Sequence, residues 1–330
     1  MSDVLVTGGA GFIGSHVVDE LVRMGRRVIV LDDLSGGFAD NVPEAATFVR
    51  GSILNNRLVT SLFETYQIET VFHLAAYAAE GLSHFIKRYN YRNNLLGSVH
   101  LINAAVNSGV TCFVFTSSIA VYGDAPCPMS EDMPPQPVDS YGIAKAAVEA
   151  ELRVTQRLFG LRFVVFRPHN VYGERQNIGD RYRNVVGIFM NQIMKGEPLT
   201  IFGDGGQTRA FTHISDVAPT IARAAFTEAA HNQVFNLGAD EPVSVRRLAE
   251  EVSRAMGVAP RVRHVAPRDE VREAYCTHEK AARVLGFKAR MPLSEGLARM
   301  ARWARRHGSR RSKRFRHIEI TRNLPAVWQE

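Results

Sequence analysis

The sequence predicts an α/β fold, with a doubly wound parallel sheet in the first half of the chain and a smaller, less regular α/β region in the second. Short, fully apolar runs alternate with amphipathic stretches up to about residue 167, and a glycine-rich turn follows the first run. Beyond residue 167 the pattern becomes irregular. A chain of 330 residues has room for one large domain or two medium ones.

Six apolar runs have the length and composition of parallel strands that helices cover on both faces. They lie at 4–7, 28–31, 47–49, 71–74, 113–116 and 163–167. The amphipathic stretches between them predict helices at 12–24, 54–66, 84–107 and 141–159. In the second half, helices are expected near 215–228, 244–256 and 293–306, with a glycine-rich turn at 203–206.

The net charge of +7 comes from one short segment. Nine Lys or Arg residues and no Asp or Glu lie between Arg299 and Arg316, so the rest of the chain carries about −2. The only aromatic residues in this segment are Trp303 and Phe315, and no nucleic-acid-binding fold is recognisable. We therefore favour a solvated basic helix end and expect no nucleic-acid partner.

No apolar run is long enough to span a membrane, and no export signal precedes the first strand, so we expect no membrane partner. The three cysteines, Cys112, Cys127 and Cys276, have spacings typical of neither a disulfide framework nor a metal site. The sequence therefore predicts a cytoplasmic protein without a bound metal.

A glycine-rich turn joins the first strand to the first helix. Gly8 permits a tight turn, Gly11 lets backbone N–H groups approach a pyrophosphate, and Gly14 allows the helix to pack closely. Asp32 ends the second strand, where a carboxylate accepts hydrogen bonds from an adenosine ribose and repels a 2′-phosphate. The pattern predicts bound NAD rather than NADP; the alternative is a purely structural turn.

Tyr141 and Lys145 are four residues apart at the start of a predicted helix and share one of its faces, and Ser118 follows the fifth strand. Beside a cofactor, the Lys145 ammonium and the nicotinamide charge would lower the pKa of Tyr141, so that it serves as a general base. Ser118 would share the proton of the substrate hydroxyl. The alternative is a buried tyrosine beside a surface lysine.

The sequence resembles the extended short-chain dehydrogenase/reductases, and among them the NAD-dependent epimerase/dehydratase family of the UDP-glucose 4-epimerase type. The similar stretches are VTGGAGFIGSH at 6–16, LDDLSGG at 31–37, FHLAA at 72–76, TSSIAVYG at 116–123, SYGIAK at 140–145, FRPHNVYGERQ at 166–176 and IFGDGGQTRAFTHISDVA at 201–218. The resemblance covers nearly the whole chain from Val4 to about Arg306. It implies a Rossmann domain at 1–167 with later helices packing back on it, a mainly nucleotide-sugar-binding region at 168–306, and an extension at 307–330.

The resemblance also implies site residues. Ser118, Tyr141 and Lys145 would be the catalytic trio, and the last two would also contact the cofactor. The other implied NAD contacts are Gly8, Gly11, Phe12, Ile13, Gly14, Asp32, Asp33, Ser35, Gly36, Ser52, Ile53, Leu74, Ala75, Ala76, Asn94, Ser117 and Pro168. The implied contacts to the nucleotide diphosphate of the sugar are Asn170, Asn184, Arg209 and Arg268.

Several positions depart from the family pattern. Ser52 stands where the family generally has an Asp that reaches adenine. Glu80 and His84 either face the sugar or belong to a solvated loop, and His169 is either a packing residue or a substrate contact. The extension ends in an apolar stretch, 318–328, of a kind that packs on its own domain or on a partner subunit.

The expected reaction is inversion at C4 of a nucleotide sugar, most simply a UDP-sugar, through a 4-keto intermediate with NAD. The related 4,6-dehydratases usually carry an Asp-Glu pair where this chain has Ile119 and Ala120, so elimination is not expected unless Glu80 and His84 supply the proton chemistry. A dehydratase, decarboxylase or 5-epimerase of the same family and a non-catalytic NAD sensor are the alternatives. The apolar stripes of the helices at 84–107 and 141–159 predict a homodimer.

Overall fold

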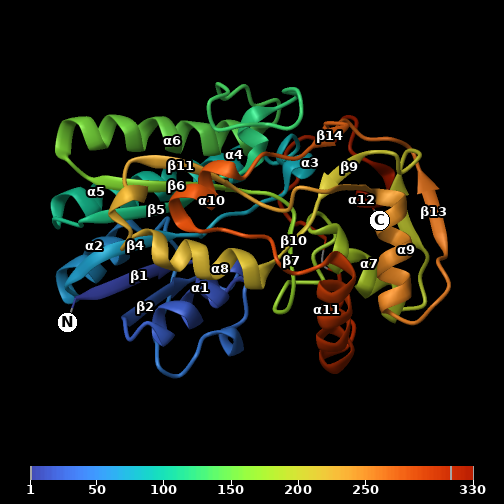
Figure 1. Ribbon diagram of the computed structural model, residues 1–330, viewed down its shortest axis with the longest axis horizontal. Coiled ribbons are helices and arrows are strands. Elements are labelled where there is room, and N and C mark those ends of the chain that lie inside the picture. The colour runs from blue at the N-terminus through green and yellow to red at the C-terminus, as the bar shows by residue number, and fades with distance from the viewer. Residues whose placement is uncertain (1, 313, 330) are drawn as a thin grey trace.

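Seven parallel strands form the central sheet of the computed structural model, which describes residues 2–312 and 314–329 (Figure 1). Their order is β11-β6-β5-β4-β1-β2-β3. The bounds are β1 Asp3–Thr7, β2 Arg27–Asp32, β3 Thr47–Arg50, β4 Ile68–His73, β5 Cys112–Thr116, β6 Arg162–Pro168 and β11 Gln233–Leu237. The order reverses direction at β1, so the carboxyl ends of β1 and β4 border a crevice where ligands of such sheets bind. The predicted doubly wound fold is confirmed.

Helices cover both faces of this sheet and divide its core into two clusters. On one face lie α1 (Phe12–Arg23), α8 (Ile214–Ala224) and α10 (Glu279–Leu285); on the other lie α2 (Asn56–Thr65), α5 (Gly97–Asn107) and α6 (Ser140–Phe159). Side chains alternate along β1, with Val4 and Val6 in the first cluster and Leu5 in the second. Burial on both faces explains why these strands are continuous apolar runs.

Residues of the later chain complete the sheet. Strand β11 pairs with β6, and helix α8 packs against α1 on the same face. The family resemblance implies helices that pack back in this way, whereas the seventh strand is not predicted from the sequence. Its sequence, Gln-Val-Phe-Asn-Leu, contains polar residues and lacks the continuous apolar run by which the other strands were predicted.

The segment predicted as one helix at 84–107 is interrupted. It consists of α3 (Glu80–Ser83), α4 (Lys87–Tyr91), a π-helical turn at Arg92–Leu96, and α5. At the start of α4, the carboxylate of Glu319 accepts hydrogen bonds from the N–H groups of Arg88 and Tyr89. A partner so distant in the sequence leaves no local signal.

A second, smaller core lies beyond the sheet, on the right in Figure 1. Helices α7 (Val185–Met194), α9 (Val245–Ala255) and α11 (Leu293–His307) surround it. Short strands in the same part of the chain pair as β10-β7, β12-β9-β14 and β13-β8. Their bounds are β7 Val171–Tyr172, β8 Leu199–Phe202, β9 Thr208–Ala210, β10 Thr212–His213, β12 Pro242–Ser244, β13 Val262–Val265 and β14 Glu273–Ala274. The predicted helices of the second half are present, whereas α7 and α10 were not predicted.

The C-terminal extension packs on its own chain. Leu324 and Trp328, the latter in the helical turn α12 (Ala326–Gln329), form an apolar cluster with Ala79, Leu82 and Tyr182. Of the two arrangements considered from the sequence, the structure has the intramolecular one.

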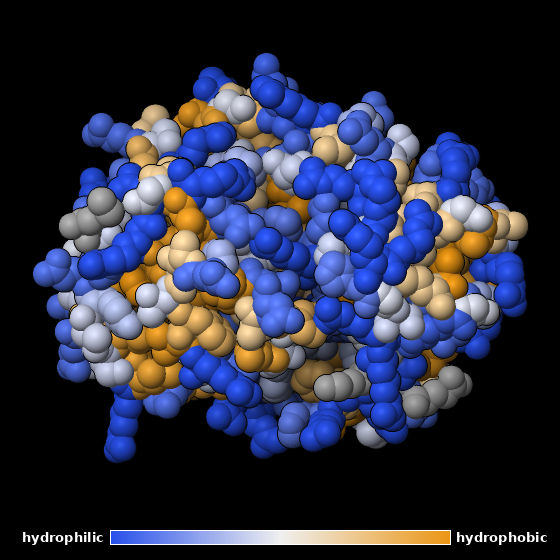
Figure 2. All heavy atoms as spheres, turned by 90° about the horizontal axis from the view of Figure 1, so that it is seen from below, coloured by the Kyte–Doolittle hydropathy of each residue, from blue (hydrophilic) through white to orange (hydrophobic). Residues whose placement is uncertain are grey.

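Hydrophilic residues cover most of the face in Figure 2, and the largest hydrophobic area lies in its left half, over the part that holds the central sheet in Figure 1. Among residues 2–312 and 314–329, no helix is both long and apolar enough to cross a membrane.

Candidate active site

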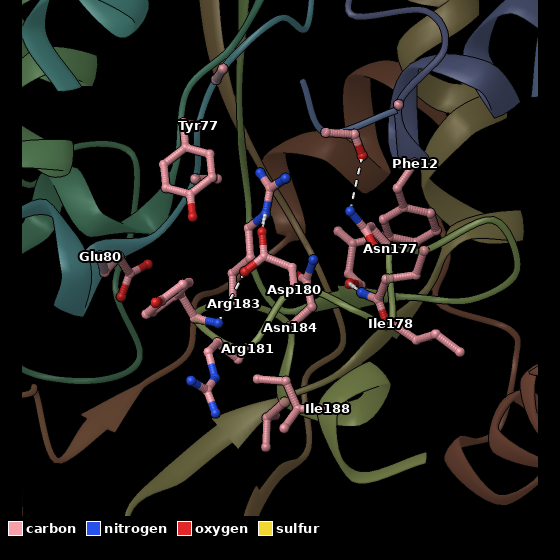
Figure 3. A pocket seen from close by; sticks show the side chains of 18 of the residues that line it. Phe12, Tyr77, Glu80, Asn177, Ile178, Asp180, Arg181, Arg183, Asn184 and Ile188 are labelled. Atoms are coloured by element: carbon pink, nitrogen blue, oxygen red, sulfur yellow. Dashed lines mark hydrogen bonds and ion pairs between the residues drawn. The ribbon is translucent and has the colours of Figure 1, made fainter. Parts of the chain in front are cut away.

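A cavity of about 680 Å³ opens where the carboxyl ends of the central strands meet the second core. The glycine turn, the end of β5, the start of α6 and the segment from 176 to 192 all contribute to its wall. Figure 3 shows Tyr77 and Glu80 pointing into it from one side, with Phe12 and Asn177 on another and Asp180, Arg181 and Arg183 between them. The cavity therefore joins the two halves of the molecule.

The glycine turn is shaped by contacts that exclude side chains. Gly8 has a φ of +74°, and a Cβ atom there would lie 2.6 Å from the backbone nitrogen of Ala75. A Cβ atom on Gly14 would overlap the carbonyl of Gly8. Gly11 is the N-cap of α1, and no side chain caps this end of the helix. Its first N–H groups therefore face the cavity, as a pyrophosphate site requires.

Asp32 is buried at the end of β2 and holds the turn in place. Its carboxylate accepts hydrogen bonds from the N–H of Ala10, at 3.0 Å, and of Leu34, at 2.8 Å. Burial raises the pKa of this carboxyl, while those backbone donors oppose the shift. The carboxylate thus ties the glycine turn to the second strand, at the place predicted for the adenosine ribose.

Ser118, Tyr141 and Lys145 converge at the sheet side of the cavity, as the sequence predicts. The Lys145 ammonium donates a 2.7 Å hydrogen bond to the carbonyl of Thr116 and lies 5.7 Å from the centre of the Tyr141 ring. Asp139 caps α6 by accepting a 2.8 Å hydrogen bond from Gly142 N–H, which fixes the helix turn that carries Tyr141.

Burial shifts the pKa values of Tyr141 and Lys145 in the protein without ligands. Burial lowers the pKa of Lys145 to about 7. The pKa of Tyr141 is raised, chiefly by burial and next by the negative charge of Glu80, while the Ser118 hydroxyl lowers it. Without ligands, burial and the Glu80 charge therefore dominate. The predicted lowering of the Tyr141 pKa concerns the site with its cofactor bound, and it stays a prediction.

Glu80 lines the cavity between Tyr141 and the predicted diphosphate arginines. The Glu80 side chain is accessible to solvent, but the protein around it removes part of the water that would solvate its charge. This desolvation, together with the nearby Asp139 charge, raises the pKa of Glu80 to about 7. Arg209 and Arg268 oppose this shift. Of the two interpretations of Glu80, the structure favours the one in which it faces the cavity.

Arg209 and Arg268 are held at the edge of the cavity by fixed acceptors. Arg268 pairs with Glu270 at 2.8 Å. Arg209 donates to the carbonyls of Thr208 and Val271, at 2.8 and 2.6 Å, and lies 3.8 Å from Glu270. Asn170 and Asn184 also line the cavity, both with positive φ.

Three predicted site residues lie outside the cavity lining. Asn94 is buried and holds the backbone of Tyr77 through hydrogen bonds of 2.8 and 3.1 Å, so it supports the cavity wall from behind. His169 is buried against His278, with the ring centres 5.1 Å apart, which is the packing interpretation. His84 follows α3, edge-on to Phe85. The remaining predicted residues all line the cavity.

Several lining residues were not predicted. The Arg183 guanidinium pairs with Asp180 at 2.8 Å and lies 4.7 Å over the Tyr77 ring, and Trp328 reaches the cavity from the C-terminal extension. The charged residues at 180–183 are visible in the sequence and could have predicted the contribution of Asp180 and Arg183. Trp328 had none, because a terminal apolar stretch does not reveal where it packs.

A model of the NAD dependent epimerase/dehydratase family matches residues 4–238. The chain belongs to this family. It is 36% identical over 309 residues to the UDP-glucose 4-epimerase of Mycolicibacterium smegmatis, a match covering 91% of this chain and 98% of that one. The predicted family is thus confirmed.

Two solved structures are similar throughout. The UDP-glucose 4-epimerase of Thermotoga maritima, solved with UDP-glucose, has a TM-score of 0.87 at 35% identity, covering 92% of this chain and 99% of that one. That of Thermus thermophilus, a complex with NAD, has a TM-score of 0.87 at 34% identity, covering 91% and 98%.

Proposed function

We propose that the protein interconverts the C4 epimers of a UDP-sugar, UDP-glucose and UDP-galactose in the first instance, with Tyr141 as the proton-transfer group. It is an NAD-dependent nucleotide-sugar epimerase, an isomerase, as its relatives are. The observation that carries the proposal is one cavity that contains the glycine turn, the Ser118, Tyr141 and Lys145 group, and the arginines.

The residues present fit NAD. The uncapped N-terminus of α1 offers N–H groups to a pyrophosphate, and Gly8 and Gly14 leave no room for side chains at the turn. Asp32 and Asp33 line the same part of the cavity and would disfavour a 2′-phosphate. When bound, NAD supplies hydride acceptance and return at C4.

Tyr141 would take the proton of the C4 hydroxyl, and the Ser118 hydroxyl would share that hydrogen bond. Ser118 Oγ accepts a 3.2 Å hydrogen bond from Ala120 N–H, so its own proton remains free to be donated. The Lys145 ammonium, fixed by Thr116, is the nearby positive charge that favours tyrosinate. All three side chains are buried, which limits the contact of the proton-transfer group with solvent.

Arg209, Arg268, Asn170 and Asn184 would hold the diphosphate and the nucleoside. A guanidinium matches phosphate oxygens in forked geometry, and both arginines are already oriented by Glu270. Glu80 would accept a hydrogen bond from a sugar hydroxyl. Glu80→Ala should therefore change the relative kcat/KM among UDP-sugars without changing NAD affinity.

The alternative with a different reaction outcome is a dehydratase, decarboxylase or 5-epimerase of the same family. Ile119 and Ala120 are buried and carry no acid, so elimination would have to use Glu80. The non-catalytic sensor is the other alternative, and an intact catalytic trio in one cavity speaks against it.

The test is incubation of the purified protein with UDP-galactose, UDP-N-acetylglucosamine and UDP-glucuronate, with Tyr141→Phe as the matched inactive control. Formation of UDP-glucose from UDP-galactose, absent in the control, is the expected result. Turnover of none of these sugars, with NAD bound, would favour the sensor.

We also propose a homodimer in which α5 and α6 pair with their copies across a two-fold axis. Leu152 and Ile102 pack on the sheet of their own chain, whereas Leu96, Ile143 and Val154 are 45%, 43% and 40% exposed. These exposed residues would be buried in the dimer. A monomer in light scattering at micromolar concentration would rule it out. A cytoplasmic location remains a prediction, in keeping with three free cysteines.

A further inference from the structure

The C-terminal tail, defined here as the described residues of 308–329, crosses from the second core to the cofactor side of the cavity. At its start, the side chain of Asn191 on α7 donates to the carbonyl of Arg310 and accepts from its N–H, at 3.0 and 2.8 Å. The Arg310 guanidinium lies 3.7 Å over the ring of Phe38, which follows β2. The tail therefore contacts both halves of the molecule.

Phe315 anchors the middle of the tail to aromatic residues of the cavity wall. Its N–H donates a 3.0 Å hydrogen bond to the hydroxyl of Tyr182. Its ring centre is 5.2 Å from that of Tyr77 and 4.9 Å from that of Tyr89, and both tyrosines line the cavity. Glu319 follows and binds the N–H groups at the start of α4. The tail is thus fixed to the wall by both packing and hydrogen bonds.

Trp328 ends this path inside the cavity wall with 3% of its surface exposed. Its ring centre lies 5.5 Å from that of Tyr182 and 6.1 Å from that of Phe202. The Arg268 guanidinium lies 4.6 Å from the Phe202 ring centre and 5.9 Å from that of Trp328. Two aromatic rings therefore help to hold Arg268.

The same indole packs against the turn that carries Glu80. A Cβ atom placed on Gly81 would lie 3.3 Å from the Trp328 ring, so the glycine provides the space that the indole fills. Trp328 therefore lies against the turn that carries Glu80 and beside the Arg268 side chain. Glu80 and Arg268, which carry opposite charges, both line the cavity. Among the described residues, the buried Arg268 Nε has no hydrogen-bond partner, so stacking and the Glu270 pair set its position.

We infer that the tail forms one wall of the sugar-nucleotide part of the cavity and that Trp328 is a positioning residue for substrate binding. It holds Arg268 in place and limits the space beside Glu80. This inference rests on the proposed function for the identity of the ligand, a UDP-sugar. It assigns Trp328 an effect on binding of that ligand and none on binding of NAD, because the glycine turn lies elsewhere in the cavity.

Three variants test this role in the full-length protein: Trp328→Ala, Trp328→Phe and, as a control in the exposed part of the tail, Ile320→Ala. Loss of the stacking should raise the KM for UDP-glucose about tenfold in Trp328→Ala. Its kcat should change much less, and its NAD affinity should not change. Trp328→Phe should restore most of the KM, and Ile320→Ala should match the wild type.

An unchanged KM in a folded Trp328→Ala protein would overturn the inference, and so would loss of NAD affinity in parallel with the KM effect. The latter pattern would indicate a general structural role. Circular dichroism melting of each variant distinguishes misfolding from a binding defect.

A second measurement does not depend on turnover. The chain has two tryptophans, and the other, Trp303, is buried in the second core. In a Trp303→Phe protein the emission therefore comes from Trp328 alone, and saturation with UDP should change it. An unaltered emission while calorimetry detects UDP binding would overturn the inference.

The two proposals fail differently. If UDP changes the Trp328 emission of the Trp303→Phe protein but the wild type epimerises no UDP-sugar, the proposed function is contradicted and the tail wall is supported. If UDP does not bind at all, both are contradicted.

Discussion

Tyr141 is a buried phenol with the buried amine of Lys145 nearby. Burial and the Glu80 charge raise its pKa, and the Lys145 Nζ atom lies 5.7 Å from the ring centre. Such a phenol holds its proton until a substrate hydroxyl and a positively charged cofactor are beside it. This ordering suits an enzyme that must not lose protons to solvent during a reversible oxidation.

Replacement of Tyr141 by Phe should lower kcat by about 100-fold to 10,000-fold, because only the proton-transfer group is removed. NAD affinity should remain close to that of the wild type. Steady-state kinetics with UDP-galactose, together with NAD titration by calorimetry, measure both quantities. A variant that keeps more than about a tenth of wild-type kcat would exclude Tyr141 as the base.

Replacement of Glu80 by Gln should move the pH profile of kcat/KM. Activity that depends on deprotonated Tyr141 rises as the pH passes the pKa of that group. The Glu80 charge raises this pKa, so its removal should lower the pKa and move the rising limb to lower pH. Profiles of wild type and Glu80→Gln from pH 5 to 10 provide the comparison. A limb that stays in place or moves to higher pH would contradict the coupling.

Helix α6 positions the catalytic pair, and its start depends on Asp139. Asp139→Ala should lower the free energy of unfolding by about 1 kcal/mol, because the Gly142 N–H loses its cap. Asp139→Asn keeps an acceptor and is the matched control. Urea unfolding gives the two values, and equal stability of the two variants would show that the cap contributes nothing.

The elements that could be predicted are those whose signal is local. Strands β1 to β6 are apolar runs because helices cover both faces, and Gly8 and Gly14 are required by contacts within the turn. The capping of α4 by Glu319 and the buried packing of Asn94 and His169 depend on partners distant in sequence. The seventh strand pairs along the edge of β6, a tertiary contact that its own sequence does not reveal.

The whole molecule is organised around a cavity that both cores and the tail share. Ligand binding there should stabilise the two halves together, since residues of each line the wall. Removal of NAD should therefore lower the melting temperature of the whole protein. NAD restored at 100 times its Kd should add about 2.7 kcal/mol of stability.

Differential scanning calorimetry of stripped, NAD-loaded and NADP-loaded protein measures this effect. NADP should restore little, because Asp32 occupies the end of β2. Equal recovery with NADP, or one melting temperature in all three samples, would contradict the assignment of this cavity to NAD.

The proposed reaction requires that the hydrogen removed from C4 of a UDP-sugar returns to C4 of the same sugar. The most direct measurement is NMR of products formed from UDP-galactose deuterated at C4, and of products formed from unlabelled UDP-galactose in heavy water. Epimerisation at C4 predicts UDP-glucose that retains the C4 deuterium in the first reaction and contains no carbon-bound solvent deuterium in the second. Loss of the C4 label, or deuterium from solvent at C5, would contradict the account.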